Sequence, residues 1–122
     1  MQIERLDING VKVAVISRDE MLIRDAQSAL ELAMSVTHQT GADRFVIPKR
    51  AVCEDFFILS TGLAGEVLQK LTNYHMKAAF YGDYSRYTSK PLHDFIYESN
   101  MGGSFYFLAT KDEAIKKLSE AR

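Results

Sequence analysis

Apolar and polar residues alternate at the N-terminal end of the chain, in the segments QIERLDI and VKVAVI. Alternation with a period of two is typical of a β-strand with one covered face, and Val11, Val13 and Val15 share that face. Asn9 and Gly10 separate the two segments, and this pair favours a two-residue turn because both residues tolerate positive φ. The pattern therefore predicts an antiparallel hairpin at the start of the chain.

A helical period follows the hairpin. Ser17 and Glu20 have the spacing of a capping box, which predicts a helix over residues 17–36. A second helix is predicted over residues 62–74, where apolar residues again recur every three or four positions. The inner face of the first helix is expected to contain Leu22, Ala26, Ala29, Leu30 and Ala33, and that of the second Leu63, Val67, Leu68 and Leu71.

Two more helices are predicted in the C-terminal half of the chain. One spans residues 91–99, because Pro91 suits a first helical turn and Asn100 with the glycines after it suits a stop. The last begins at a second capping box, formed by Thr110 and Glu113. Its inner face is expected to contain Ala114, Ile115 and Leu118.

Short apolar segments between the helices predict the remaining strands. Residues 45–47 form one that Pro48 ends, and SFYFLA forms the last. MKAAFY is almost wholly apolar, which is typical of a central parallel strand covered on both faces. The order β-β-α-β-α-β-α-β-α predicts a single α/β domain over residues 1–122. Its sheet has about five mostly parallel strands with an N-terminal antiparallel hairpin, and four helices cover it.

The composition restricts the compartment in which the protein is expected and the classes of partner that it could bind. Lys and Arg number 15 and Asp and Glu 16, so no strong field attracts nucleic acid or an anionic membrane. The single Cys53 cannot form an internal disulfide, which suits a reducing compartment. No apolar run approaches the ~20 residues that span a bilayer, and the N-terminus lacks the pattern of a secretion signal. These features predict a cytoplasmic protein.

Ser60, Thr61 and Gly62 lie where the second helix is expected to start, and Gly65 follows in its first turn. One hydroxyl can cap the helix by accepting a hydrogen bond from a free N–H group. The same helix start can instead hold a phosphate or another anion. The two glycines would let a second backbone come close, from a partner or from a neighbouring strand. The residues leave these interpretations open.

Other chemistry-bearing residues give weaker signals. Glu54 and Asp55 could act as paired carboxylates, but adjacent residues rarely converge and no histidine is near them in sequence, so solvated loop acids are expected. Cys53 is expected to be a small core residue. The three histidines lie on different elements without metal-ligand spacing, and no cofactor or metal is predicted. The sequence also has no phosphate-binding glycine loop, HExxH or CxxC, and no G-x-S-x-G around Ser60.

The loop GDYSRYTS follows the predicted central strand and contains Tyr84, Arg86 and Tyr87. In open α/β sheets the loops at the carboxyl ends of strands gather ligands, and Tyr and Arg are common at binding hot spots. The alternative is that the tyrosines fold back over the sheet edge. Because the loops after Ile47 and Tyr81 leave from one end of the sheet, a shared surface is predicted. It would contain Lys49, Glu54, Ser60, Tyr84 and Arg86.

Nearly the whole chain resembles a small bacterial family known as a domain of unknown function, number 4180. The resemblance lies in AVISRDEMLIRDAQSALEL, VCEDFF, STGLAGEVLQKL, YTSKPLHDFIYESN and ATKDEAIKKL. More distantly, the layout is similar to STAS domains, the anti-sigma-factor antagonist fold, in which an Asp-Ser-Ser-Gly-Leu-Gly-type run opens a helix. The matching run begins at Leu59, where those proteins have an acid, and the preceding loop is longer here. The resemblance implies that Ser60 is a phosphorylation site.

The function expected from these observations is a STAS-like interaction module or regulatory switch without catalysis. Its partner is expected to be a protein, at a surface that contains Lys49, Glu54, Asp55, Tyr84, Arg86 and Tyr87. Its aromatic content favours a symmetric homodimer. The alternative is a small-molecule-binding protein or an enzyme that uses the same loop surface. A pocket of several hundred Å3 with convergent polar groups would favour the alternative.

Overall fold

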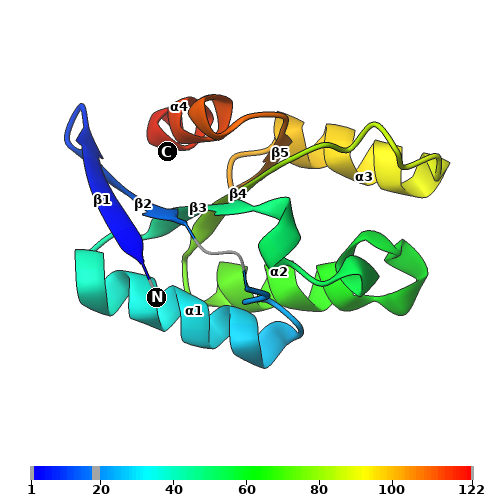
Figure 1. Cartoon of the computed structure of the whole chain (residues 1–122), viewed down its shortest axis with the longest axis horizontal. Helices are drawn as coiled ribbons and strands as arrows, with labels where there is room; N and C mark the ends of the chain where they lie inside the picture. Colours follow the sequence, from blue (N-terminus) through cyan, green and yellow to red (C-terminus); the bar gives the residue numbers. More distant parts are fainter. Residues whose placement is uncertain (1, 18–19, 122) are drawn as a thin grey trace.

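The structure is a computed structural model that describes residues 2–17 and 20–121, which form five strands and four α-helices (Figure 1). This is the α/β architecture predicted from the sequence. Three short 3-10 turns, η1 to η3, follow the third strand. The elements are β1 (Ile3–Ile8), β2 (Val11–Ile16), α1 (Ala26–Thr40), β3 (Arg44–Pro48), η1 (Lys49–Ala51), η2 (Glu54–Phe57), η3 (Leu59–Thr61), α2 (Leu63–Asn73), β4 (Lys77–Tyr81), α3 (Lys90–Met101), β5 (Phe105–Leu108) and α4 (Lys111–Glu120).

The five strands form one sheet in the order β1-β2-β3-β4-β5. β1 pairs with β2 in the predicted antiparallel hairpin, where Asn9 and Gly10 both have positive φ (52° and 82°). The pairs β2–β3, β3–β4 and β4–β5 are parallel. β4 therefore has a strand on each side and is buried at Ala78, Ala79 and Phe80, as the apolar run MKAAFY predicted.

Helices cover both faces of the sheet. Each parallel crossover from β2 to β5 moves one strand in the same direction, and crossovers of one hand then place their helices on one face. Buried residues of α1, α2 and α3 accordingly belong to one core cluster. α4 follows the last strand and packs on the opposite face, and Figure 1 shows it across the sheet from α1 and α2. The first face contains Ala14, Ile16, Phe45, Ile47, Ala78, Phe80 and Phe107, and the second Val13, Val15, Val46, Ala79 and Tyr106.

The start of α1 differs from the prediction of a helix over residues 17–36. The helix begins at Ala26, and its capping box is formed by Asp25 and Ser28 rather than by Ser17 and Glu20. Arg18 and Asp19, in the predicted first turn, lie outside the described residues. Residues 20–25, directly before the helix, are not helical.

The later start of α1 is explained by hydrogen bonds between the segment before it and the backbone of residues 51–53. Ile23 is fully buried and forms a parallel bridge with Val52. Its N–H donates to the carbonyl of Ala51 at 3.0 Å, and its carbonyl accepts from the N–H of Cys53 at 2.9 Å. These bonds satisfy the backbone of a segment whose local pattern favoured a helix. Because of this tertiary pairing, the helix begins further along the chain, at Ala26.

The later helices lie close to their predicted positions. α4 has the predicted capping box, in which Thr110 Oγ1 accepts from the Glu113 N–H at 3.2 Å and donates to the Glu113 carboxylate at 2.9 Å. α3 begins one residue before Pro91, with Ser89 as its cap, and ends at Met101 before Gly102. α2 begins at Leu63, directly after a turn that contains Ser60.

Candidate functional site

The loops after β3 and β4 leave the sheet side by side, as predicted. Pro48 pairs with Tyr81 at the last position of the parallel ladder, so residues 49–62 and 82–89 start from neighbouring points. Two hollows lie between these loops at the carboxyl edge of the sheet. We call them the basic cleft, which measures about 310 Å3, and the Ser60 groove, which measures about 420 Å3.

The Ser60 groove brings together several of the predicted surface residues. Its lining residues are Glu54, Phe57, Ile58, Leu59, Ser60, Arg86, Tyr87, Thr88, Ser89 and Pro91. Ser60 is exposed in the 3-10 turn η3, and the described residues give its hydroxyl no hydrogen-bond partner. The prediction of one surface that contains Glu54, Ser60 and Arg86 agrees with this geometry.

Thr61, not Ser60, satisfies the start of α2. Its hydroxyl accepts a hydrogen bond from the Leu63 N–H at 3.2 Å and lies 2.8 Å from the carbonyl of Asp55, to which it donates. The two hydroxyls therefore differ: that of Thr61 is hydrogen-bonded to the backbone, and that of Ser60 belongs to an exposed residue. Removing the Ser60 hydroxyl leaves the helix start intact.

No neighbouring strand of the described chain approaches the glycines in this turn. Among the described residues, a Cβ atom at Gly62 or Gly65 would meet no atom within 4 Å, so the alternative of a neighbouring strand is wrong, and approach by a partner stays a prediction. Gly62 is needed for its backbone conformation instead. Its φ of 78° lies in the left-handed region, which links η3 to α2 and which glycine adopts without strain.

Lys49 contacts side chains from both loops. Its Nζ lies 5.0 Å from the centre of the Phe57 ring and 4.8 Å from that of Tyr87, and 3.9 Å from a carboxylate oxygen of Glu54. The Tyr87 hydroxyl donates to the other oxygen of Glu54. This cradle holds the ammonium group by cation–π and ionic attraction. Glu54 and Asp55 are both exposed, but only Glu54 contacts Lys49 and Tyr87, and Asp55 lines neither hollow.

Tyr84 folds back into the core, which was one of the two alternatives for this loop. Its ring packs against Phe57 and Phe107, and its hydroxyl donates to the carbonyl of Phe80 at 2.9 Å. Burial, with a smaller contribution from Tyr87, raises the pKa of Tyr84. Burial also raises the pKa of Tyr87, with further contributions from its hydrogen bond to Glu54 and that carboxylate's charge. Both phenols remain protonated at neutral pH.

The basic cleft lies next to the groove and shares one residue with it. Its lining residues are Lys49, Arg50, Tyr81, Gly82, Asp83 and Arg86, of which Arg86 also lines the Ser60 groove. Arg50, Tyr81, Gly82 and Asp83 were not singled out from the sequence. Their position directly after two apolar strands was the available signal, because ligands gather at that edge.

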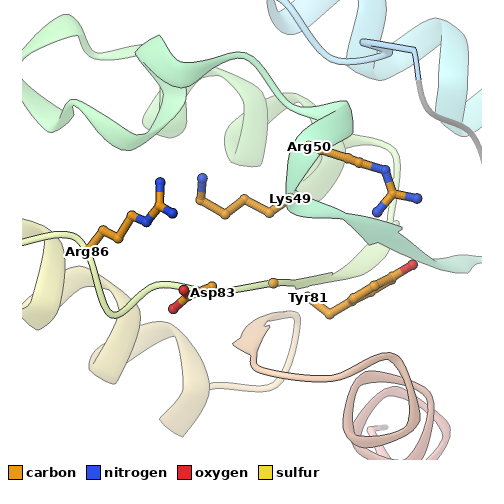
Figure 2. Close-up of a pocket in the computed structure, with 6 residues that line it drawn as sticks. Lys49, Arg50, Tyr81, Asp83 and Arg86 are labelled. Atoms are coloured by element: carbon orange, nitrogen blue, oxygen red, sulfur yellow. The ribbon is translucent and has the colours of Figure 1, made fainter.

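Charged side chains meet inside the basic cleft. Figure 2 shows Lys49 and Arg86 extending toward each other near Asp83, while Arg50 lies beside Tyr81 at the other end. Hydrogen bonds from Ser85 lower the pKa of Asp83, and the charges of Arg86 and Lys49 lower it further. The carboxylate is therefore ionised at neutral pH. Within the described part of the chain, the Arg86 guanidinium forms no hydrogen bond or ion pair.

The other candidate residues lie elsewhere. Cys53 is half-buried, with its Sγ 3.6 Å from the carbonyl of Arg24. His38 lies on α1, His75 follows α2 with φ of 59°, and His93 lies on α3 with its ring against the carbonyl of Tyr87. Over residues 2–17 and 20–121, no three His, Cys, Asp or Glu side chains are grouped so that they could hold a metal.

Together, the fold and the two hollows define an open α/β protein with its candidate binding surface at the carboxyl edge of the sheet. The chain belongs to the family described as Domain of unknown function (DUF4180), whose family model matches residues 8–118. Neither a curated protein nor a solved structure matches the chain. The likeness to STAS domains remains a prediction. Among the described helices, none has both the length and the apolar character needed to cross a membrane.

Proposed function

We propose that this chain is a binding module without catalysis, and that it works as a regulatory switch whose partner contacts the Ser60 groove. The observation that carries the proposal is the exposed Ser60 hydroxyl, which has no partner among the described residues and lines a groove of about 420 Å3. A hydroxyl in this position is open to a modifying enzyme. No described residue is hydrogen-bonded to it as a base, which a nucleophilic serine would need.

Phosphorylation of Ser60 would change the groove rather than the fold. A phosphate adds about −1.5 to −2 charges, and the Arg86 guanidinium lines the same groove. Charge-assisted hydrogen bonds between the two would draw the groove closed, while Glu54 would repel the new charge. Because Thr61 rather than Ser60 bonds to the start of α2, the helix would be unaffected. A partner would therefore meet a different surface on the same scaffold.

Affinity purification from the native host, with mass spectrometry of both partners and phosphosites, tests this function. Ser60→Asp is expected to lose a partner that wild type retains, and Ser60→Ala to keep it. Ser119→Asp on α4 is the control for added charge, since this residue lies away from the groove. Ser60→Ala should also change the free energy of unfolding by less than about 0.5 kcal/mol. A Ser60→Asp protein that keeps every partner, together with an unmodified Ser60 in the host, would contradict the proposal.

A second candidate function is the binding of a small molecule at the same edge. The basic cleft favours it, because a hollow of about 310 Å3 with convergent charged groups has the form of a ligand site. This function needs no modification of Ser60 and no protein partner. A screen of small anions against the purified protein tests it separately from the first proposal.

A further inference from the structure

We propose that the basic cleft binds a small molecule that carries a phosphate monoester, with Arg86 and Lys49 as the residues that hold the phosphate. The site lies at the carboxyl ends of β3 and β4, where parallel α/β sheets place their ligands. It differs from the Ser60 groove in its lining and in its charge. The binding requires neither phosphorylation of Ser60 nor a partner protein.

The charge of the cleft selects an anion. Lys49, Arg50 and Arg86 line it with one acid, Asp83, and a Glu54 carboxylate oxygen lies 3.9 Å from the Lys49 ammonium, so the formal excess is one positive charge (three minus two). The whole chain, by contrast, has a formal net charge of −1. The local excess therefore does not follow from the composition. A phosphate neutralises it and offers three acceptor oxygens to these cations.

The two cations that would hold the phosphate are already in place. Lys49 and Arg86 extend toward each other, although like charges repel (Figure 2). The rings of Phe57 and Tyr87 fix the Lys49 ammonium at 5.0 and 4.8 Å, so little side-chain entropy remains to be lost on binding. The Arg86 guanidinium has no hydrogen bond or ion pair within the described residues. Its planar fork matches two phosphate oxygens.

Gly82 keeps the cleft open beside Lys49. A Cβ atom on this residue would lie 2.7 Å from Lys49 Cβ, so any other side chain would push the lysine stem away. The Lys49 side chain is only 23% exposed and emerges between the two loops. The glycine thereby allows the ammonium group to reach the cleft from the end of the neighbouring strand.

Asp83 limits what the rest of the ligand can be. Its carboxylate is ionised and oriented by the Ser85 N–H at 2.8 Å, so it accepts hydrogen bonds and repels a second anionic group. A hydroxyl group next to the phosphate satisfies it, and a second phosphate does not. The volume of about 310 Å3 is at the lower end of the range for ligand sites. The expected class is thus a small hydroxylated phosphate monoester.

Titrations of the unphosphorylated full chain, followed by amide NMR shifts and calorimetry, test this inference. The probes are glycerol 3-phosphate, inorganic phosphate, succinate and glycerol. We expect glycerol 3-phosphate to bind most tightly, to shift the amides of Gly82 and Asp83, and to bind more tightly as the pH rises through about 6, where the phosphate becomes a dianion. Glycerol should not bind, and inorganic phosphate and succinate should bind more weakly.

Arg86→Gln should weaken glycerol 3-phosphate binding about tenfold or more and leave the thermal melt unchanged, since this guanidinium forms no hydrogen bond or ion pair within the described residues. Arg5→Gln, on β1 at the far edge of the sheet, removes the same charge and should leave the affinity unchanged. Asp83→Asn should strengthen inorganic phosphate relative to glycerol 3-phosphate. The inference is overturned if no phosphate shifts the cleft amides, or if both arginine variants weaken binding equally. None of these outcomes depends on Ser60.

Discussion

Gly82 affects both the backbone conformation at the end of β4 and the basic cleft, which it lines. Its φ of 158° is one that other residues rarely adopt. Because glycine has no side chain, the Lys49 stem can pack directly against it. A single methyl group here therefore disturbs both the strand end and the cleft.

We expect Gly82→Ala to lower the free energy of unfolding by about 2 kcal/mol or more, because of the strained φ and the 2.7 Å contact with Lys49 Cβ. Chemical denaturation measures this. Gly65→Ala is the matched control, since Gly65 lies within α2 with open space around it, and the change should stabilise the protein by about 0.5–1 kcal/mol. Equal effects of the two substitutions would contradict the contact with Lys49.

Arg44 is a buried charge at the first residue of β3, which is the end of the strand opposite the candidate site. Its Nη1 donates to the carbonyls of Leu118 and Ala121, at 2.9 and 2.7 Å, which satisfies the C-terminal end of α4. Its Nε donates to the carboxylate of Asp43 at 2.8 Å. These bonds attach α4 to β3. They also connect the stability of the fold to the ionisation of Asp43.

The hydrogen bond from Arg44 lowers the pKa of Asp43 below the usual value near 3.8. Because the folded-state pKa is the lower one, Asp43 stabilises the fold above its unfolded pKa, and this stabilisation is lost as the pH falls through the folded value. We expect Asp43→Asn to be less stable than wild type at pH 7, with the difference closing in acid below about pH 4. Urea unfolding at several pH values measures it. In an Arg44→Gln background the same substitution should have little effect at any pH.

At the scale of elements, α3 protects the exposed edge of the sheet. β5 pairs with β4 on one side only, and an unpaired strand edge is a site for aggregation. The Asn100 side chain occupies that edge. Its Oδ1 accepts from the Phe107 N–H at 2.7 Å, and its Nδ2 donates to the Phe107 carbonyl at 3.0 Å, as a neighbouring strand would.

Asn100→Ala should lower the free energy of unfolding by about 2 kcal/mol, since it leaves both backbone groups of Phe107 without a partner. It should also increase concentration-dependent association, which light scattering measures. Asn73→Ala is the control, because the one side-chain partner of this exposed residue among the described residues is Gln69 on the same helix. The change should stay within about 0.5 kcal/mol. An Asn100→Ala protein as stable and monodisperse as this control would show that the edge needs no such protection.

At the scale of the whole molecule, Arg86 joins the two hollows because it lines both. A charge at Ser60 and a phosphate in the basic cleft would compete for one guanidinium. Ser60→Asp is therefore expected to weaken glycerol 3-phosphate binding about fivefold, within the usual range of coupling between sites. Calorimetry measures the effect, and it should vanish in an Arg86→Gln background. Unchanged affinity in Ser60→Asp would mean that the two hollows act independently.

The expected symmetric homodimer also remains a prediction at this scale. Every phenylalanine is buried or half-buried, so the exposed aromatic surface comes from Tyr74 and Tyr97, at 53% and 65% exposed. A dimer that covers aromatic surface would use one of these two tyrosines. Light scattering at high protein concentration decides between monomer and dimer, and a monomer at all concentrations would contradict the expectation.

The sequence by itself determined the elements and their order. The alternation around Asn9 and Gly10, the apolar run that forms β4 and the capping box at Thr110 each depend on residues close together in the chain. Local periodicity and turn chemistry therefore sufficed to predict an α/β sheet with an antiparallel hairpin. Because parallel strands expose their carboxyl ends at one edge, the shared surface of Glu54, Ser60 and Arg86 was also predictable.

Only the tertiary structure decided how those residues are used. The start of α1 moved because Ile23 bonds to backbone near Val52. The basic cleft exists because β3 and β4 pair with Pro48 opposite Tyr81, which brings Lys49 against Gly82 and beside Asp83. Asn100, expected only to end a helix, bonds to β5 instead. Each of these contacts joins residues that are distant in sequence or on different elements. Local patterns can indicate the loops that contain such residues, but strand register and packing determine the contacts themselves.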